Sequence, residues 1–252
     1  MMTISAVVIA NNEERNIARC LDSLAWADEI ILIDSDSLDR TAEIARAHGA
    51  RVTKRSWNGF GPTKQAAVDL ATSDWVLSID ADEVVNPALA AMIRQKIEGA
   101  SEVSGYYIKR KTLFMGRWIQ YCGWYPDRVL RLFRRNRGRF DDALVHERVI
   151  LDGPGENIEE DILHYSYPDL ETYMAKFGRY MALGAEELHA KGRRAGLLDL
   201  TIRPVASFVK HYVTRQGFRD GVPGLVISTM SSIAVFVKYA KLWELQKGSA
   251  GK

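Results

Sequence analysis

The stretch Trp75-Val-Leu-Ser-Ile-Asp80-Ala-Asp82-Glu83 decides how the fold is interpreted. A short apolar run is followed at once by three carboxylates, which is typical of a buried β-strand whose end meets open space. Side chains alternate along an extended chain, so Asp80 and Asp82 can point to the same side. Two carboxylates this close repel each other unless a cation lies between them, and a hard divalent ion that also binds phosphate is the natural partner. Alone, the same pattern indicates only a solvated acidic turn.

Strand and helix patterns alternate through the first hundred residues. We expect strands at 4–10, 29–34, 51–53 and 75–79, and helices at 13–24, 40–48, 64–72 and 87–98. Asn86 is expected to cap the last of these helices, and Pro87 suits its first turn. Short links between alternating strands and helices imply a parallel, doubly wound α/β sheet.

Polar residues follow three of the expected strands, at positions 11–13, 34–36 and 80–82. In parallel α/β sheets, ligands bind beyond the carboxyl ends of the strands. We therefore expect the three polar clusters to converge on one edge of the sheet and to form a site there.

The composition sets broad limits. With 252 residues, of which 47% are hydrophobic, the chain can form one large domain or one domain with an appendage. Cys20 and Cys122 lie far apart, which argues against a disulfide scaffold and favours a reducing compartment. The apolar run at 4–10 follows no basic segment and is too short for the core of a signal peptide, so we expect a cytoplasmic protein.

A basic block lies in the middle of the chain. Ten Lys or Arg residues and a single acid, Asp127, occupy positions 109–139. Such a block indicates an anionic partner such as a phosphorylated sugar, a lipid headgroup or a nucleic acid, or else a solvated basic hairpin. Short strands rich in aromatic residues and arginine are expected at 106–108, 129–133 and 145–151.

The chain after residue 168 is expected to be helical, with a break near 192–196, a helix opening at Pro204, and another after 221–224. Residues 222–237 carry no charge. This segment has 16 residues, whereas a membrane-spanning helix needs about 20. Flanking cations favour a segment lying in an anionic membrane interface. A packed terminal helix or a dimer contact is the alternative. We expect one domain at 1–168 and a helical region at 169–252.

Several segments together resemble the nucleotide-sugar domain of family 2 glycosyltransferases of the GT-A type. They are Ala6-Val-Val-Ile-Ala-Asn-Asn-Glu-Glu14, Ile33-Asp34-Ser-Asp-Ser-Leu-Asp-Arg-Thr41 and Ile79-Asp80-Ala-Asp82. Later segments are similar to the bacterial subgroup that contains the lipopolysaccharide core β-1,4-glucosyltransferase: Gly123-Trp-Tyr-Pro-Asp127, Arg131-Leu-Phe133, Val145-His146-Glu147, Leu163-His164-Tyr-Ser and residues 203–221. The resemblance covers nearly the whole chain. It implies a Rossmann-like, mostly parallel sheet with helices on both faces, plus a helical carboxyl-terminal extension.

The resemblance also implies a site for a UDP-sugar. Asp34 would accept a hydrogen bond from uracil, and the loop that includes Ala10, Asn12 and Glu13 would wrap the base. Lys64 would neutralise the diphosphate. Asp82, with Asp80 in support, would hold Mg²⁺ or Mn²⁺. A later histidine often completes the metal site in this family, and His164 is our candidate, with His146 as its rival. In purely structural roles, Asp34 would cap a turn and Lys64 would be a solvated helix-end lysine.

An inverting transfer needs a base for the acceptor hydroxyl. The family places a catalytic carboxylate after the metal motif, and Glu147 is our candidate. This chain has His-Glu where Glu-Asp is commoner, so Asp141 and Asp142 are kept as substitutes. If none of these roles applies, Glu147 pairs with an arginine. We expect the acceptor, a phosphorylated saccharide, to meet aromatic faces and arginines, and the candidates are Trp124, Tyr125, Arg128 and Arg131.

These expectations describe an inverting, metal-dependent hexosyltransferase. It would move glucose from UDP-glucose to an inner-core heptose of a lipopolysaccharide precursor, or to a related surface glycan, as a peripheral protein at the inner face of the cytoplasmic membrane. Transfer to a polyprenyl phosphate or another lipid-linked acceptor is the alternative. A sugar-phosphate nucleotidyltransferase would usually have a Gly-rich phosphate loop after the first strand, where this chain has Asn11-Asn-Glu-Glu14. A non-catalytic membrane- or anion-binding module leaves the acidic clusters unexplained, and those clusters would repel nucleic acid.

Overall fold

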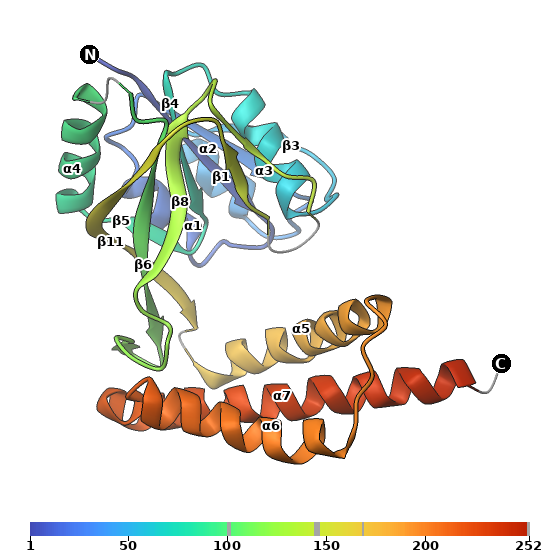
Figure 1. The fold of residues 1–252 in the computed structure, drawn as a ribbon. Helices are drawn as coiled ribbons and strands as arrows, with labels where there is room; N and C mark the ends of the chain where they lie inside the picture. The colour runs from blue at the N-terminus through green and yellow to red at the C-terminus, as the bar shows by residue number, and fades with distance from the viewer. Residues whose placement is uncertain (100–101, 144–146, 168, 251–252) are drawn as a thin grey trace. The chain divides into compact units, whose positions relative to one another are not determined.

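The computed structural model describes residues 1–99, 102–143, 147–167 and 169–250 (Figure 1). The chain divides into two compact units. The first comprises Met1–Arg110 and Asp127–Tyr165, and the second comprises Lys111–Pro126 and Ser166–Lys252. The second unit therefore includes a segment, Lys111–Pro126, that the expected boundary at residue 168 assigned to the amino-terminal domain.

The first unit is built on a mixed sheet with the strand order β3-β2-β1-β4-β8-β6-β11-β5. Its strands are β1 (Ile4–Ala10), β2 (Glu29–Asp34), β3 (Arg51–Lys54), β4 (Trp75–Asp80), β5 (Glu83–Val85), β6 (Gly105–Phe114), β8 (Asp127–Arg134) and β11 (Gly155–Tyr167). Strands β1 to β4 pair in parallel, as expected. Strand β8 is antiparallel to β4 and β6, and β5 is antiparallel to β11. The antiparallel half therefore extends the sheet beyond the parallel part that the sequence predicts. A separate two-stranded ribbon pairs β9 (Gly138–Phe140) with β10 (Val149–Leu151).

Helices cover both faces of the parallel strands. They are α1 (Ile17–Asp22), α2 (Thr41–Ala47), α3 (Phe60–Asp69) and α4 (Pro87–Glu98). Because side chains alternate along a strand, Ala6 and Val8 of β1 join one apolar cluster, together with residues of α1, α2 and α4. Val7 joins a second cluster with Val68 of α3. Burying both faces explains the continuous apolar runs of these strands.

Two helix starts differ from the expectation. Helix α1 begins at Ile17, after a turn in which Asn16 N–H donates to the Glu13 carbonyl at 2.9 Å. The Glu13 and Glu14 N–H groups donate to Thr41 Oγ1 and Asp39 Oδ2, which ties this turn to the segment that follows β2. Helix α3 begins earlier than expected, with Pro62 in its first turn, where a missing N–H does no harm. Helix α4 agrees with the prediction, because Asn86 Oδ1 accepts from Leu89 N–H at 2.8 Å.

The second unit is mainly helical. It contains α5 (Leu170–Ala190), α6 (Leu197–Val209), the short turns η1 (Lys210–Thr214) and η2 (Gly217–Asp220), and α7 (Gly221–Ala250). Strand β7 (Arg117–Trp118) pairs with the end of β6. Helices α5 and α6 both lie along α7 (Figure 1). Pro204 does not open a helix, as we expected, but lies inside α6. Its carbonyl accepts a hydrogen bond from Ser232 Oγ at 2.7 Å, which fixes the proline against α7.

Helix α7 is longer than its uncharged part. The segment Gly217–Lys247 is long and apolar enough, by length and composition alone, to cross a membrane: its mean hydropathy is 1.5, and 22% of its most apolar stretch is buried. The helix continues through Lys238 and Lys241. Residues 222–237 by themselves are too few to span a membrane, but that argument does not apply to the whole helix.

Candidate active site

The carboxyl ends of β1, β2 and β4 meet at one edge of the sheet. Ala10 lies opposite Asp34, and Ile9 lies opposite Asp80, so the two aspartates flank the end of β1 on either side. The loops that follow these strands carry the polar clusters found in the sequence. This edge is therefore the place where a ligand would meet all three.

The loops after β1 and β2 are tied together by side chains. Asn12 N–H donates to Ser37 Oγ at 2.9 Å, and Leu38 N–H donates to Asn12 Oδ1 at 2.8 Å. Asn11 Nδ2 donates to the Ser35 carbonyl. Asn12 has φ 57°, a left-handed conformation that asparagine tolerates better than most residues. The two loops thus form one preshaped wall beside the end of β1.

Asp34 lies behind this wall and is fully buried. Its Oδ1 accepts a long hydrogen bond of 3.4 Å from Ser37 N–H. Among the residues that the structure describes, Asp34 Oδ2 and the neighbouring Ser35 Oγ are buried without a hydrogen-bond partner. A buried acceptor left unpaired costs about 1–3 kcal/mol. A ligand that brings an N–H donor to this point would remove that cost.

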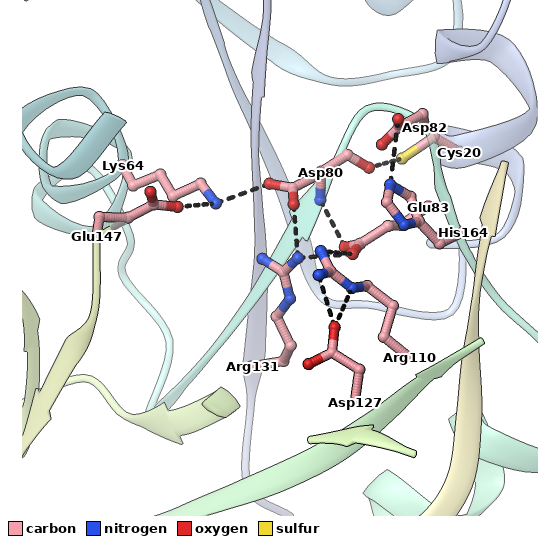
Figure 2. A network of polar contacts seen from close by, with 10 residues as sticks. All are labelled: Cys20, Lys64, Asp80, Asp82, Glu83, Arg110, Asp127, Arg131, Glu147 and His164. Atoms are coloured by element: carbon pink, nitrogen blue, oxygen red, sulfur yellow. Dashed lines mark hydrogen bonds and ion pairs between the residues drawn. The ribbon is translucent and has the colours of Figure 1, made fainter. Parts of the chain in front are cut away.

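Asp80, at the end of β4, lies between two cations (Figure 2). Its Oδ1 is 2.7 Å from Lys64 Nζ, and its Oδ2 is 2.5 Å from Arg131 Nη2. Burial alone would raise the pKa of Asp80, but the charges of Arg131 and Lys64 outweigh it and hold this pKa well below its usual range. Asp80 is therefore a fixed anion.

Arg131 connects Asp80 to a second buried carboxylate. Its Nη2 also lies 2.6 Å from Glu83 Oε1, and Glu83 Oε2 accepts from the Asp80 backbone N–H at 2.9 Å. Burial would lower the pKa of Arg131, but Asp80 and Glu83 raise it above its ordinary value. Arg110 adds a further cation, 3.6 Å from Glu83 and 2.6 Å from Asp127 (Figure 2). This chain of charges fixes the turn that follows β4.

Lys64 joins α3 to Glu147 as well as to Asp80. The Lys64 Nζ to Glu147 Oε1 distance is 2.7 Å, and the lysine is buried. Residues 141–143 are held against α3, because Gly61 N–H donates to the Ala143 carbonyl at 3.0 Å. A Cβ on Gly61 would lie 2.0 Å from the Asp141 carbonyl oxygen, so only glycine permits this approach. Helix α3 thus sets the position of Glu147.

The substitutes for Glu147 have different surroundings. Asp141 Oδ1 accepts from the backbone N–H groups of Ala143 and Arg148, at 3.3 and 3.1 Å, and so holds the turn. Asp142 is exposed. Of the three carboxylates, Glu147 is the one paired with a cation that also contacts Asp80.

Asp82 follows β4 and lies beside His164 of β11. Its Oδ2 is 3.3 Å from His164 Nε2, and the Tyr165 N–H donates to its backbone carbonyl at 2.8 Å. His146, the rival to His164, lies outside the described residues. Within the ranges that the structure describes, no group of three or more His, Cys, Asp or Glu side chains forms a metal site.

The pair Asp82–His164 fits a divalent cation by its donor types. A carboxylate oxygen suits Mg²⁺ and Mn²⁺, and imidazole is a common ligand of divalent transition metals. Asp80 contributes differently, because Lys64 and Arg131 each contact one of its oxygens. Asp80 as a direct metal ligand stays a prediction.

The four acceptor candidates do not form one group. Trp124 packs in an apolar cluster of the second unit, and Tyr125, which precedes a cis proline, belongs to the same unit. Arg128, in the first unit, pairs with Glu159 at 2.8 Å. Arg131 is buried between Asp80 and Glu83, which leaves it unsuited to the acceptor contact that we expected and makes it a support for Asp80 instead.

The sequence did not single out Glu83, Arg110 or Asp127 as part of the site. One clue was present: Arg131 stands in the apolar run Val129-Leu-Arg-Leu-Phe133, and a buried arginine requires a carboxylate partner. Nothing local in the sequence identifies that partner, which lies on another strand.

Comparisons with known proteins identify the family of the chain. Residues 5–148 match the model of Glycosyl transferase family 2. The chain is similar to a lipopolysaccharide core biosynthesis glycosyltransferase LpsC of Rhizobium meliloti, with 27% identity over 96% of this chain and 93% of that protein. An uncharacterized glycosyltransferase of Rickettsia felis is 30% identical over 97% of this chain and 90% of that protein.

A solved structure shows the same fold. The crystal structure of S. aureus TarS 1-349 in complex with UDP-GlcNAc aligns with a TM-score of 0.51 and 16% identity, over 98% of this chain and 92% of that one. The sheet is accordingly of the GT-A type, with a helical carboxyl-terminal part. On the match of its family model and of these relatives, the chain belongs to glycosyl transferase family 2.

Proposed function

We propose that the chain transfers a hexose with inversion, glucose from UDP-glucose, onto an inner-core heptose of a lipopolysaccharide precursor or a related surface glycan. The likeness to LpsC over nearly the full length of both chains supports this acceptor class. The observation that carries the proposal is the grouping of Asp34, the Asp82–His164 pair and the Lys64–Glu147 pair around the carboxyl edge of one sheet.

The donor base would lie at the wall formed by the first two loops. Asp34 Oδ2, buried and without a partner among the described residues, would accept the ring N–H of uracil. Backbone groups of Ala10, Asn12 and Glu13 border the same place and would fix the plane of the base. Lys64 stays committed to Asp80 and Glu147, so its role for the diphosphate would be to set the local charge.

Asp82 and His164 would hold Mg²⁺ or Mn²⁺ together with the donor phosphates. When bound, the cation supplies Lewis-acid stabilisation of the charge on the departing diphosphate. The protein's part is to keep the turn after β4 rigid. Arg131 and Glu83 do this by binding the Asp80 side chain and backbone, so that Asp82 enters the site from a fixed position.

Glu147 would take the proton from the attacking acceptor hydroxyl. Lys64 contacts its Oε1, and Oε2 is the oxygen that we assign to the proton. The acceptor oxygen would attack the anomeric carbon of the donor sugar from the face opposite the leaving diphosphate, which inverts the configuration at that carbon. Asp141 is less suited to this task because its carboxylate already holds a turn.

The second unit would bind the inner face of the cytoplasmic membrane. Helix α6 and the turn after it carry an exposed apolar stripe at spacings of three and four residues: Leu198, Ile202, Val205, Val209 and Val213. The opposite side of α6, with Pro204, packs on α7. This apolar stripe faces away from α7, and such a surface suits the boundary between lipid headgroups and acyl chains.

The charges of the second unit also favour membrane binding by this surface. Residues 193–241 contain eight Lys or Arg and two acids. Asp199 pairs with Arg203, and Asp220 is buried. Helix α7 adds exposed Val222, Leu225, Ile233, Phe236 and Trp243. Anionic lipid would therefore meet an apolar surface bordered by cations. The same surface also fits a polyprenyl phosphate or another lipid-linked acceptor, which is our second candidate acceptor class.

A donor screen tests the proposed activity. The chain is incubated with several nucleotide sugars and Mn²⁺, and release of each nucleoside diphosphate is measured. We expect UDP release, with UDP-glucose the fastest donor. The Glu147→Gln variant should bind UDP-glucose as the wild type does and lose turnover. Release of no nucleoside diphosphate from any donor would contradict the transferase assignment.

A further inference from the structure

A small hollow lies in the second unit, between residues 120–125 and 214–216. Its volume is about 200 Å³, and its lining includes Tyr121, Tyr125, Arg215 and Gln216. All of these residues belong to the same unit. None of them takes part in the charge network of the candidate active site. The hollow is therefore distinct from the site described above.

A buried carboxylate behind the hollow holds two of its lining residues in place. Asp220 is 1% exposed and accepts hydrogen bonds from the backbone N–H groups of Gln120 and Tyr121, at 3.2 and 2.8 Å. The Cys122 N–H donates to the Arg215 carbonyl at 3.1 Å, and His211 Nδ1 lies 2.7 Å from the Cys122 carbonyl oxygen. The two loops are therefore fastened to each other through their backbones.

The loops also adopt conformations that are uncommon for their residues. Cys122 and Gln216 have φ of 59° and 54°, in the left-handed region that non-glycine residues rarely occupy. Gly217 packs so closely that a Cβ would lie 2.8 Å from Cys122 Sγ and 2.8 Å from the His211 carbonyl oxygen. Residues held in such conformations are concentrated at ligand sites, where the surrounding structure fixes them.

Cations and aromatic rings surround the opening. The exposed Arg215 side chain lies along Gly123, with Nη1 3.4 Å from the position of a Cβ there, and in the described part of the chain its guanidinium forms no ion pair. The Arg219 guanidinium lies 4.5 Å from the centre of the Tyr121 ring, and its Nη1 donates to Gln216 Oε1 at 2.9 Å. The nearby acid, Asp220, is buried and already engaged. The hollow thus combines positive charge with phenol rings.

We propose that this hollow binds a phosphate ester, the chemical class expected of the acceptor, carried either on a sugar or on a membrane lipid. The proposal rests on the proposed function. Arginine binds phosphate through two parallel N–H donors, and tyrosine rings provide faces for a sugar. Val213 and Phe218, which flank the 214–216 segment, are 56% and 53% exposed. They place the phosphate site beside an apolar surface, as a lipid-borne ligand requires.

Binding of soluble and lipid phosphates to the full chain provides the test. The probes are glucose 6-phosphate, glucose, and vesicles of phosphatidylglycerol or phosphatidylcholine, measured by calorimetry and by co-sedimentation. We expect glucose 6-phosphate to bind and glucose not to bind. Arg215→Gln should weaken phosphate binding by about tenfold or more, and Arg215→Lys less, because the charge is kept and the paired donors are lost. Arg194→Gln, at an exposed arginine of the same unit, should bind glucose 6-phosphate as the wild type does.

The two sources of phosphate give different results. Arg215-dependent binding of glucose 6-phosphate assigns the hollow to a phosphorylated sugar. Arg215-dependent binding of phosphatidylglycerol vesicles without binding of glucose 6-phosphate assigns it to a lipid headgroup. Failure to bind either probe, or binding that Arg215→Gln leaves unchanged, overturns the proposal.

UDP release from the donor in the absence of acceptor separates this proposal from the transferase assignment. Wild-type hydrolysis of UDP-glucose without acceptor reports on the donor site alone, and Arg194→Gln, at an exposed arginine that belongs to neither site, should keep that rate. A chain that hydrolyses the donor but shows no Arg215-dependent phosphate binding contradicts only the acceptor hollow. A chain that binds phosphate esters but releases no nucleoside diphosphate contradicts only the proposed transfer.

Discussion

Arg131 donates a 2.5 Å hydrogen bond to the carboxylate of Asp80, in a site where the arginine is only 3% exposed. The aspartate of a motif that we expected to attract a metal ion is thus compensated by the protein's own cation. Asp82, two residues later, lies beside His164 instead. The two aspartates of the motif therefore differ in their surroundings: Asp80 is held by cations, and Asp82 lies beside a histidine.

Replacing Arg131 should destabilise the first unit strongly. In Arg131→Met, Asp80 and Glu83 lose the guanidinium that they share, and Glu83 is fully buried. Removing one partner of a buried charge network costs about 3–5 kcal/mol. Urea denaturation would measure the loss. Arg128→Gln is the matched control, because the exposed pair with Glu159 contributes about 0–1 kcal/mol. Equal stability of the two variants would show that the buried network does not stabilise the unit.

Gly61→Ala should slow turnover without weakening donor binding. The new Cβ would lie 2.0 Å from the Asp141 carbonyl oxygen, so either the backbone at Asp141 or helix α3, whose Lys64 contacts Glu147, has to move. A displacement of about 1 Å at a catalytic group can lower kcat by about a hundredfold. Steady-state kinetics with UDP-glucose would measure kcat and KM separately. The control is Gly178→Ala in α5, where an added Cβ meets no atom within 4 Å. An unchanged kcat in Gly61→Ala would remove Glu147 from its assigned role.

Glu29 should make the unfolding free energy depend on pH. Burial would raise its pKa, but hydrogen bonds from Ser5 Oγ and from the N–H and Oγ1 of Thr72 outweigh burial and lower it. A lowered folded-state pKa gives stability that is fully present above the unfolded value of about 4.3 and is lost as the pH falls through the folded value. Stability should therefore fall on acidification below about pH 4.3.

The matched variant for this effect is Glu29→Gln, which keeps the shape of the side chain and removes its charge. Its unfolding free energy, measured by denaturant titration at several pH values, should decline less steeply below about pH 4.3 than that of the wild type. Parallel curves for the two proteins would assign the acid sensitivity to other carboxylates.

A charge placed in the α6 stripe should weaken membrane binding. Ile202 and Val205 are 61% and 63% exposed, so Ile202→Glu with Val205→Glu should leave the fold intact. The added carboxylates oppose both acyl contact and attraction to anionic headgroups. Co-sedimentation with phosphatidylglycerol vesicles should fall by about tenfold or more, since each apolar side chain contributes about 1.5–3 kcal/mol when buried. Ala190→Glu, at an exposed position of α5 outside the stripe, should bind nearly as the wild type does. Wild-type binding by the double variant would place the membrane contact elsewhere.

The parallel half of the sheet could be predicted because its information is local. Continuous apolar runs mark strands buried on both faces, and the polar residues at their ends identify the edge where ligands bind. The observed register confirms that Asp34 and Asp80 flank the end of β1. Asn86 as the cap of α4 is likewise a local feature.

The partners of the basic block could not be predicted, because they are distant in the chain. Counting charges over residues 109–139 finds a single acid nearby, yet Arg131 pairs with Asp80 and Glu83, and Lys109 pairs with Glu159 and Asp161. Much of the apparent charge excess is thus compensated across the sheet. The position of Pro204 inside α6 was missed for a related reason, since packing against α7 outweighs the local preference of proline for a helix start.

Metal-dependent UDP release by the wild type and by Asp82→Asn tests whether the chain is a transferase that holds a divalent cation at Asp82. Both proteins are assayed with UDP-glucose, first with EDTA and then with Mn²⁺ in excess, and their stabilities are compared by urea denaturation. We expect the wild type to release UDP only with Mn²⁺, and Asp82→Asn to lose about a hundredfold or more of this activity at unchanged stability, because electrostatic stabilisation of the leaving group is a large part of such catalysis. Release that continues in EDTA, or that Asp82→Asn retains in full, would contradict this assignment.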